Sequence, residues 1–357
     1  MTLFSEYQLG KLTLQNRIVM APMTRSRAIE NIPSDLMATY YGQRAGAGLI
    51  ITEGTAPSPN GLGYPRIPGA FSEEQIAGWK KITEAVHKGG AKIFLQIMHV
   101  GRVGHPANLP SGAELVAPSP IAVSGEMYTD TKGLQPHPEP REMTKEDISH
   151  TISEYVDTAK NAIAAGFDGV EIHGANGYLI EQFINTASNK RNDEYGGNVE
   201  NRARFAIEVA SAIVKAIGAE RTGIRLSPYG VFNDMAVYEE LDATYEYLAK
   251  ELKKLELTYI HLVDHTAMGA PEVPQSIKEK VRDAFRGTII ISGGYDGEKA
   301  EKDLAAGLGH LVAFGRPYLA NPDLPERLKQ NAELNNPDFD TFYTPGEKGY
   351  TDYPFFN

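Results

Sequence analysis

The sequence contains no cysteine. This absence excludes disulfides, cysteine-ligated iron–sulfur clusters and thiol catalysis, and it is compatible with a reducing compartment. Long apolar runs are absent too, because no stretch approaches the ~20 consecutive apolar residues that a membrane-spanning helix needs. Residues 1–20 lack the basic region followed by an apolar core that a secretory signal would show. We therefore expect a cytoplasmic protein with no membrane association.

Clusters of lysine and arginine are also missing from the chain, which has 46 acidic and 35 basic residues and a net charge of −11 at pH 7. Neutralising nucleic-acid phosphates takes clustered positive charge, so we expect no nucleic-acid partner. What the sequence does have is 41% hydrophobic residues in a length of 357, which is enough for a large buried core. The length allows one large domain or two ordinary ones, and a monomer and a homodimer both stay open.

Eight short apolar runs recur along the chain. Their hydrophobicity is continuous rather than alternating, which is typical of strands that are covered on both faces in a parallel sheet. The runs are RIVM (17–20), LIIT (49–52), KIFLQI (92–97), GVEIH (169–173), GIRLS (223–227), YIHLV (259–263), TIIIS (288–292) and HLVAF (310–314).

Segments with helical spacing lie between these runs, and several begin with Ser, Thr or Pro and end with Gly, as helices do. They are residues 34–45, 72–89, 144–166, 199–218, 238–256, 274–285 and 297–307. A closed (β/α)₈ barrel needs eight strand–helix repeats, and an open sheet rarely supplies so many. We therefore predict an α/β fold with one TIM-barrel domain over residues 1–357. Residues 101–143, rich in Pro and Gly, interrupt the pattern after the third strand, where we expect a capping subdomain with a small hairpin.

Two glycine-containing turns follow the seventh and eighth predicted strands. Gly293 and Gly294 lie in SGGYDGEKA, and Gly315 precedes Arg316 in FGRP. Glycines let backbone N–H groups approach a phosphate, a following helix N-terminus adds positive potential, and an arginine binds two oxygens at once. Because active sites of barrels lie at the C-terminal strand ends, these residues predict a phosphate site, with ordinary turn chemistry as the alternative.

Several longer motifs follow one another along the chain: APMTR (21–25), LQIMHVGR (95–102), HGANGYLIEQF (173–183), RNDEYGGNVENR (191–202) and GYTDYP (349–354). In these motifs the sequence resembles the classical branch of the old yellow enzyme family of flavin-dependent ene-reductases, over essentially its whole length. The resemblance implies a barrel that binds FMN non-covalently at its C-terminal mouth. It also implies reduction by NADPH or NADH, and reoxidation by an activated alkene such as an enone, a maleimide or a nitroalkene.

The stretch VEIHGANGYLIEQF (170–183) contains the implied catalytic residues. An α,β-unsaturated carbonyl accepts a hydride at its β-carbon only if the charge that develops on its oxygen is stabilised. His173 and Asn176 match the family's hydrogen-bond donors for that oxygen, and Tyr178 matches its proton donor to the α-carbon. Taken singly, each could be structural: a strand-end histidine, a turn asparagine and a core aromatic. Their joint occurrence in the motif favours the catalytic interpretation.

The resemblance also implies the cofactor contacts. The matching residues are Pro22, Met23, Thr24, Gly54, Gln96, Arg225, Gly293, Gly294, Gly315 and Arg316. Thr24 would hydrogen-bond a flavin carbonyl, Gln96 would contact the pyrimidine edge, and Arg225 would stabilise negative charge on the reduced ring. The alternative for Arg225 is a buried ion pair with Glu171 or Glu53.

Substrate contacts are implied for Tyr64, Met98 and Tyr343 by the same resemblance. Met98 lies where classical relatives often have a tryptophan, so a slimmer and more flexible side chain should reshape that wall of the substrate site. The charged segment RNDEYGGNVENRARF (191–205) is interpreted as structural, capping the fourth helix and bracing the barrel mouth through pairs of Arg and Asp.

Three other functions fit the sequence less well. HLVDH (261–265) could indicate a metal-dependent hydrolase, but the first strand ends in MAPMTR instead of a His-x-His pair, so we expect no metal site. A Schiff-base aldolase needs a lysine at the C-terminal end of a strand, whereas Lys92 begins one. A flavin-binding protein without turnover is disfavoured by the proton donor and the two hydrogen-bond donors.

Overall fold

The structure, a computed structural model, describes residues 2–356 and contains a closed barrel of eight parallel strands. The barrel strands are β3 (Ile18–Met20), β4 (Leu49–Ile51), β5 (Lys92–Ile97), β10 (Gly169–Gly174), β11 (Thr222–Leu226), β12 (Tyr259–Leu262), β13 (Thr288–Ser292) and β14 (Leu311–Phe314). Each lies within a residue or two of a predicted run, and β14 pairs with β3 to close the sheet. The predicted (β/α)₈ barrel is confirmed.

Side chains alternate between the two faces of each barrel strand, and both faces are buried. In β5, Ile93 and Leu95 pack outward in the large core beneath the helices, while Phe94 belongs to the cluster inside the barrel. In β10, Val170 and Ile172 likewise belong to the outer core. Alternation puts Glu171 and His173 on the inner face of β10. Continuous hydrophobicity in the sequence therefore reflects an apolar outer layer and an inner layer that becomes polar toward the mouth.

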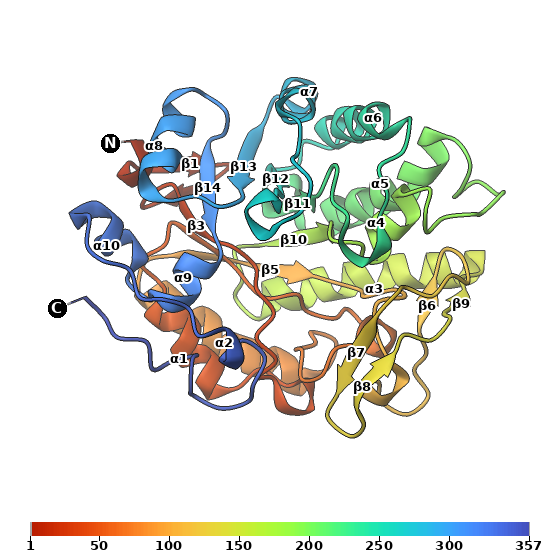
Figure 1. The fold of residues 1–357 in the computed structure, drawn as a ribbon, viewed down its shortest axis with the longest axis horizontal. Helices are drawn as coiled ribbons and strands as arrows, with labels where there is room; N and C mark the ends of the chain where they lie inside the picture. Colours follow the sequence, from red (N-terminus) through yellow and green to blue (C-terminus); the bar gives the residue numbers. More distant parts are fainter. Residues whose placement is uncertain (1, 357) are drawn as a thin grey trace.

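Helices surround the barrel (Figure 1). They are α1 (Asp35–Gln43), α2 (Glu73–Lys88), α3 (Lys145–Ala164), α4 (Leu179–Ile184), α5 (Val199–Ile217), α6 (Leu241–Lys254), α7 (Gln275–Phe285), α8 (Gly297–Ala305), α9 (Arg316–Ala320) and α10 (Leu324–Gln330). Short 3₁₀ turns lie at η1 (Thr2–Phe4), η2 (Ile29–Asn31), η3 (Pro59–Gly61), η4 (Pro106–Asn108), η5 (Ala219–Arg221), η6 (Phe232–Asp234), η7 (Thr266–Met268) and η8 (Phe339–Thr341). The seven predicted helices are confirmed. Capping boxes at Ser72 and Thr144 begin α2 and α3, which fixes both boundaries in the local sequence.

The predicted excursion after the third barrel strand is confirmed, because β5 ends at Ile97 and α3 begins at Lys145. Between them, β6 (Val116–Ala117) pairs with β9 (Arg141–Glu142), and β7 (Glu126–Thr129) forms a hairpin with β8 (Gly133–Pro136). The hairpin projects at the edge of the molecule (Figure 1). The treatment of residues 101–143 as a subdomain stays a prediction.

A second hairpin, which the sequence did not predict, precedes the first barrel strand. Its strands β1 (Tyr7–Leu9) and β2 (Leu12–Leu14) are antiparallel. Leu9 and Leu14 are fully buried against side chains from the beginnings of the barrel strands, including Leu49 and Tyr259. The hairpin therefore closes the N-terminal end of the barrel.

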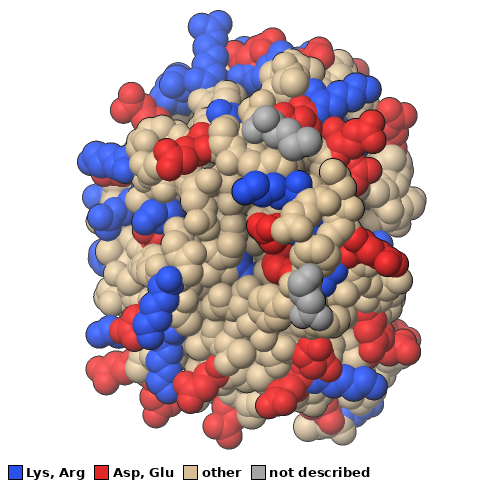
Figure 2. Space-filling view, turned by 90° about the vertical axis from the view of Figure 1, so that its left-hand side faces the viewer, with Lys and Arg blue, Asp and Glu red and all other residues tan. Residues whose placement is uncertain are grey.

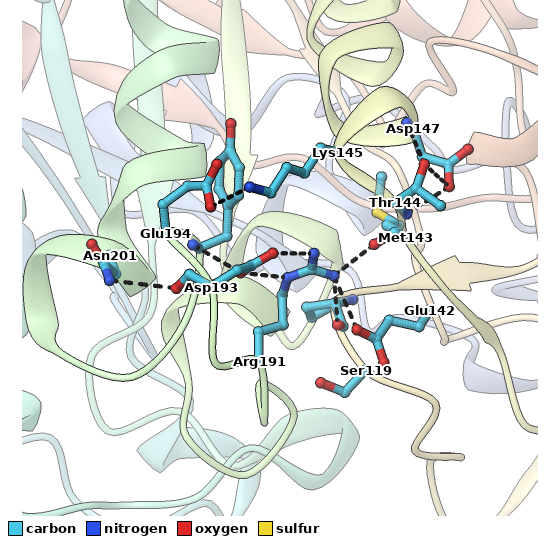
Figure 3. A network of polar contacts seen from close by, with 12 residues as sticks. Ser119, Glu142, Met143, Thr144, Lys145, Asp147, Arg191, Asp193, Glu194 and Asn201 are labelled. Atoms are coloured by element: carbon cyan, nitrogen blue, oxygen red, sulfur yellow. Dashed lines mark hydrogen bonds and ion pairs between the residues drawn. The ribbon is translucent and has the colours of Figure 1, made fainter.

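The charged segment after α4 joins the excursion to α5 (Figure 3). Arg191 pairs with Asp193 at 2.6 Å and donates to the carbonyl oxygen of Met143 at 2.6 Å. Asn198 caps α5 by accepting the N–H of Asn201. The predicted helix cap and the predicted pairing of Arg with Asp are confirmed.

The outer surface mixes both signs of charge. Lys and Arg side chains are interspersed with Asp and Glu over the face in Figure 2. Within residues 2–356, none of the helices combines the length and the apolar character that crossing a lipid bilayer would take.

Candidate active site

A cavity of ≈520 Å³ opens at the C-terminal ends of the barrel strands. Most residues predicted to bind flavin line it: Pro22, Met23, Thr24, Arg225, Gly293, Gly294, Gly315 and Arg316. A second cavity of ≈980 Å³ lies between the mouth and the β7–β8 hairpin. The two cavities share lining residues, among them Thr24, Asn176, His265 and Tyr343, so they form one continuous site. Its combined size is that of a small-molecule site with room for more than one ligand.

Two of the predicted flavin residues, Gly54 and Gln96, are buried and do not line the cavities. A Cβ on Gly54 would lie 2.4 Å from the sulfur of Met98, so the close packing of Met98 requires glycine there. Met98 is itself buried in an apolar cluster and lines neither cavity, which differs from its predicted substrate contact. The amide nitrogen of Gln96 donates to Glu171 at 2.8 Å, which leaves the Gln96 carbonyl oxygen to accept from another group.

Arg225 lies on β11 and reaches the cavity wall. Burial lowers the pKa of its guanidinium, and the nearby Glu171 carboxylate partly offsets that effect. No salt bridge joins Arg225 to Glu171 or Glu53 within residues 2–356, and the Arg225 Nε lacks a hydrogen-bond partner there. Glu171 instead accepts from Gln96, Tyr259 and His261. The buried ion pair is therefore absent, and the cation faces the cavity.

The glycine turns have the geometry that a close approach requires. Gly293 and Gly294 have φ of 125° and 62°, and a Cβ on either would lie 2.5 Å from a neighbouring atom. Arg316 lies over the Phe339 ring at 5.2 Å and extends into the same wall. Asp296 caps α8, the helix after this turn, by accepting the N–H of Lys299, and the predicted contribution of the helix N-terminus to phosphate binding stays a prediction. An acidic cap at that helix end offsets the positive potential that was expected to help bind a phosphate.

His173 is the last residue but one of β10 and is almost completely buried. Its Nδ1 accepts the N–H of Ala175 at 3.3 Å, so in the neutral ring the proton is on Nε2. Burial lowers the pKa of His173 well below its usual value, and the positive charge of Arg225 lowers it further. At neutral pH this histidine is an uncharged N–H donor.

Asn176 is at the centre of the turn and has φ of 60°, a left-handed conformation that asparagine tolerates. Its N–H donates to Ser227 Oγ at 2.9 Å, and its carbonyl oxygen accepts from Asn233 at 2.7 Å. Its side-chain Oδ1 lies 2.9 Å from His265 Nε2. The structural interpretation of Asn176 thus holds for its backbone, while its side chain lines both cavities.

Tyr178 precedes α4, and its ring packs edge-on against His173 with centroids 4.9 Å apart. Its hydroxyl donates to the hydroxyl of Tyr64 at 3.1 Å. Burial raises the pKa of Tyr178, while the contact with the Tyr64 hydroxyl and the charge of Arg225 act in the opposite direction. Tyr64, Tyr178 and Tyr343 all line the outer cavity, so the structure brings the predicted acid beside two of the predicted substrate contacts.

Similarity in sequence to known proteins shows which family the chain belongs to. The NADH:flavin oxidoreductase / NADH oxidase family matches residues 2–335. The chain belongs to this family. It is 45% identical over 359 residues to 12-oxophytodienoate reductase 1 of Oryza sativa subsp. japonica, covering 99% of this chain and 93% of that protein. It is 42% identical over 352 residues to a Leishmania infantum protein named "Probable flavin mononucleotide-dependent alkene reductase", covering 97% and 95%.

Solved structures agree with this assignment. Morphinone reductase in complex with tetrahydroNAD has a TM-score of 0.94 and 44% identity, covering 100% of this chain and 98% of that chain. An old yellow enzyme homologue from Zymomonas mobilis has a TM-score of 0.94 and 40% identity, covering 99% of both chains. The resemblance to the old yellow enzyme family is therefore confirmed. The protein is a flavin-dependent oxidoreductase that uses FMN and a nicotinamide dinucleotide.

The residues of this old yellow enzyme site fit FMN. The Arg225 guanidinium, whose Nε lacks a protein partner within the described residues, can stabilise a negative ring. Gly294, Gly315 and Arg316 line the same cavity and can bind the phosphate.

Sequence reasoning missed the residues that hold the turn in place. Glu181 accepts from the N–H of Gly177, from Ser227 Oγ and from the Tyr245 hydroxyl, all at 2.6–2.9 Å. These partners come from separate elements, and no local pattern shows that they converge. The HLVDH histidines also have structural partners, because His261 contacts Glu171 and His265 contacts Asn176. Within residues 2–356, no three His, Asp or Glu side chains form a group that could hold a metal ion.

Proposed function

We propose that this old yellow enzyme homologue reduces activated alkenes, with His173 and Asn176 binding the oxygen of the activating group and Tyr178 protonating the α-carbon. The observation that supports this most directly is the composition of one turn. Its asparagine lines both the cavity that fits FMN and the outer cavity, its phenol lines the outer cavity, and its uncharged histidine lies behind them, packed edge-on against the phenol. FMN, held by the residues that line the first cavity, would supply the transfer of a hydride from NADPH or NADH to the β-carbon of the alkene.

The two N–H donors stabilise the charge that develops on the carbonyl oxygen as the β-carbon gains a hydride. His173 suits this role because burial and Arg225 keep its ring neutral, with the proton on Nε2. A neutral donor stabilises the oxyanion without giving up its own proton. Loss of one such donor costs about 2.7–4 kcal/mol of transition-state stabilisation in other enzymes.

Tyr178 delivers the proton that completes the reduction. Its pKa is raised by burial, so the hydroxyl stays protonated until the substrate develops a basic α-carbon. The phenolate left behind is stabilised by the hydroxyl of Tyr64 at 3.1 Å and by the charge of Arg225. An enone, a maleimide or a nitroalkene each presents an acceptor oxygen and an adjacent double bond, which is the pattern that this site recognises.

A flavin-binding protein without turnover is the second candidate, and one assay separates the two. Steady oxidation of NADPH that depends on added 2-cyclohexenone is expected of the reductase and not of the binding protein. Substitution of His173 and Asn176 together by alanine is expected to weaken binding of a phenol, which presents an anionic oxygen as the enolate does. Undiminished phenol affinity in that double variant would contradict the assigned donors. The protein is proposed to be a monomer or a homodimer, and the mass measured by sedimentation would distinguish the two.

A further inference from the structure

The second histidine of HLVDH has no part in the reaction as described so far. His265 lies just after β12 and lines both cavities beside Asn176. Its Nε2 is 2.9 Å from Asn176 Oδ1, and its ring packs edge-on against Phe232 with centroids 4.5 Å apart. It is thus a half-buried imidazole in direct contact with a residue that binds substrate.

The backbone of Asn176 is fixed without help from His265. Ser227 accepts its N–H, and Asn233 donates to its carbonyl oxygen. Ser227 is in turn held by Glu181, which also fixes Gly177. Among residues 2–356, however, His265 is the hydrogen-bond partner of the Asn176 side chain. The rotation of the amide about its last bond therefore depends on this one contact.

That rotation decides whether the amide helps or opposes the reaction. An asparagine amide has a donor end and an acceptor end of nearly the same shape. With the N–H groups toward the substrate, the amide stabilises a developing negative oxygen; turned over, it would place its own carbonyl oxygen there and repel that charge. A donor on His265 Nε2 favours the first orientation, because it occupies Oδ1 and leaves the N–H groups free.

The surroundings keep His265 in the form that this contact needs. Burial and the positive charge of Arg225 lower its pKa to about 4, so the ring is neutral at pH 7. A neutral ring has one N–H, and the Nε2 proton is the one that satisfies Asn176 Oδ1. Asp264, whose charge would oppose this effect, pairs with Lys278 at 2.6 Å.

We propose that His265 is a positioning residue for alkene reduction: its Nε2–H holds Asn176 Oδ1 and thereby turns the Asn176 N–H groups toward the substrate oxygen. The inference rests on the proposed role of Asn176. The competing role is a structural one, in which the imidazole only fills space against Phe232. If His265 acts through the amide, removing its N–H has little effect once the Asn176 amide is gone. If the imidazole only fills space, its removal has the same effect with and without that amide.

The test compares His265→Leu, which lacks the N–H, with His265→Gln, which can donate to the same oxygen. His150→Leu is the matched control, because His150 is on the outer face of α3 and its side chain is 77% exposed. Each FMN-loaded protein is titrated with p-chlorophenol, and its reduced form is mixed with 2-cyclohexenone without oxygen. We expect His265→Leu to weaken phenol binding and slow reoxidation by about 10- to 100-fold, less than the loss of a whole donor. Reduction by NADPH should change less than threefold, and His265→Gln should recover most of the loss.

A double-variant cycle with Asn176→Ala gives the sharper result. If His265 acts through the amide, His265→Leu adds little to Asn176→Ala, because there is no amide left to orient. Equal effects of His265→Leu in both backgrounds, or no recovery in His265→Gln, would overturn the positioning role. Should His265→Leu fail to bind FMN, His265→Phe keeps a ring and lacks the N–H, and the same expectation applies to it. A wild-type holoprotein that neither binds phenol nor reacts with 2-cyclohexenone would instead overturn the proposed function itself.

Discussion

Tyr178 and Tyr64 share a hydrogen bond at the wall of the outer cavity, and their different partners separate their roles. Both tyrosines line the outer cavity, and Tyr178 also packs edge-on against His173. The structure therefore relates Tyr64 to the proposed acid as well as to the proposed substrate site, which the sequence alone did not indicate.

Tyr178→Phe removes the hydroxyl and keeps the ring against His173. We expect flavin reduction by NADPH to be unchanged, while reoxidation by 2-cyclohexenone slows by about 10²- to 10⁴-fold, the range for loss of a positioned acid. Stopped-flow measurement of the two half-reactions separates these effects. Reoxidation at the wild-type rate would remove Tyr178 as the proton donor.

Much of the site could be predicted from single residues, because they lie at strand ends, where barrel side chains converge. Thr24, Arg225 and Arg316 line the cavity as expected. The contact between His265 and Asn176 could not be predicted, because these residues follow different strands and their distance depends on how two loops fold. The position of Met98 was unpredictable for a similar reason, since its packing over Gly54 is a contact between two strand ends.

Elements of the fold differ in how clearly the sequence announces them. The barrel strands were evident because burial of both faces leaves continuous apolar runs. The strands β1 and β2 contain three residues each, which is too few to show a period. The helices α9 and α10 were missed because they are short, with five and seven residues. Arg191 connects two irregular segments, because it pairs with Asp193 in one and donates to the Met143 carbonyl oxygen in the other.

Arg191→Met should destabilise the protein by about 1–3 kcal/mol, the range for leaving partly buried acceptors without their charged donor. The side chain of Arg191 is only 5% exposed, and its loss leaves the Asp193 carboxylate without its cation and the Met143 carbonyl without its donor. Urea unfolding of the holoprotein gives the measurement. A second substitution, Asp193→Asn, should recover part of the loss because it removes the orphaned charge.

The control for this prediction is Lys160→Met, which breaks the exposed pair between Lys160 and Asp157 on α3. We expect a change of less than about 1 kcal/mol there. Equal effects of Arg191→Met and Lys160→Met would show that the network in Figure 3 contributes nothing particular to stability.

The molecule as a whole should be more stable with its cofactor, because a ligand that binds only the folded state adds to the free energy of unfolding. FMN and riboflavin share the ring and differ in the phosphate. If Arg316 binds that phosphate, FMN should raise the melting temperature more than riboflavin does at equal concentration. In Arg316→Ala the two ligands should act alike, with FMN affinity about tenfold or more weaker.

The control here is Lys302→Ala on the outer face of α8, which should keep the difference between the two ligands. Thermal unfolding monitored by circular dichroism gives the comparison. A wild-type protein stabilised equally by FMN and riboflavin would place the phosphate away from Gly294, Gly315 and Arg316.

The N-terminal hairpin has a consequence for the order of events in turnover. Leu9 and Leu14 plug one end of the cylinder, so whatever reaches the flavin arrives and departs at the other. Coenzyme and alkene then share a single entrance, and the oxidised nicotinamide has to dissociate before the alkene can bind. The two half-reactions then follow one another through successive binding at the same place, so an excess of either ligand should inhibit binding of the other.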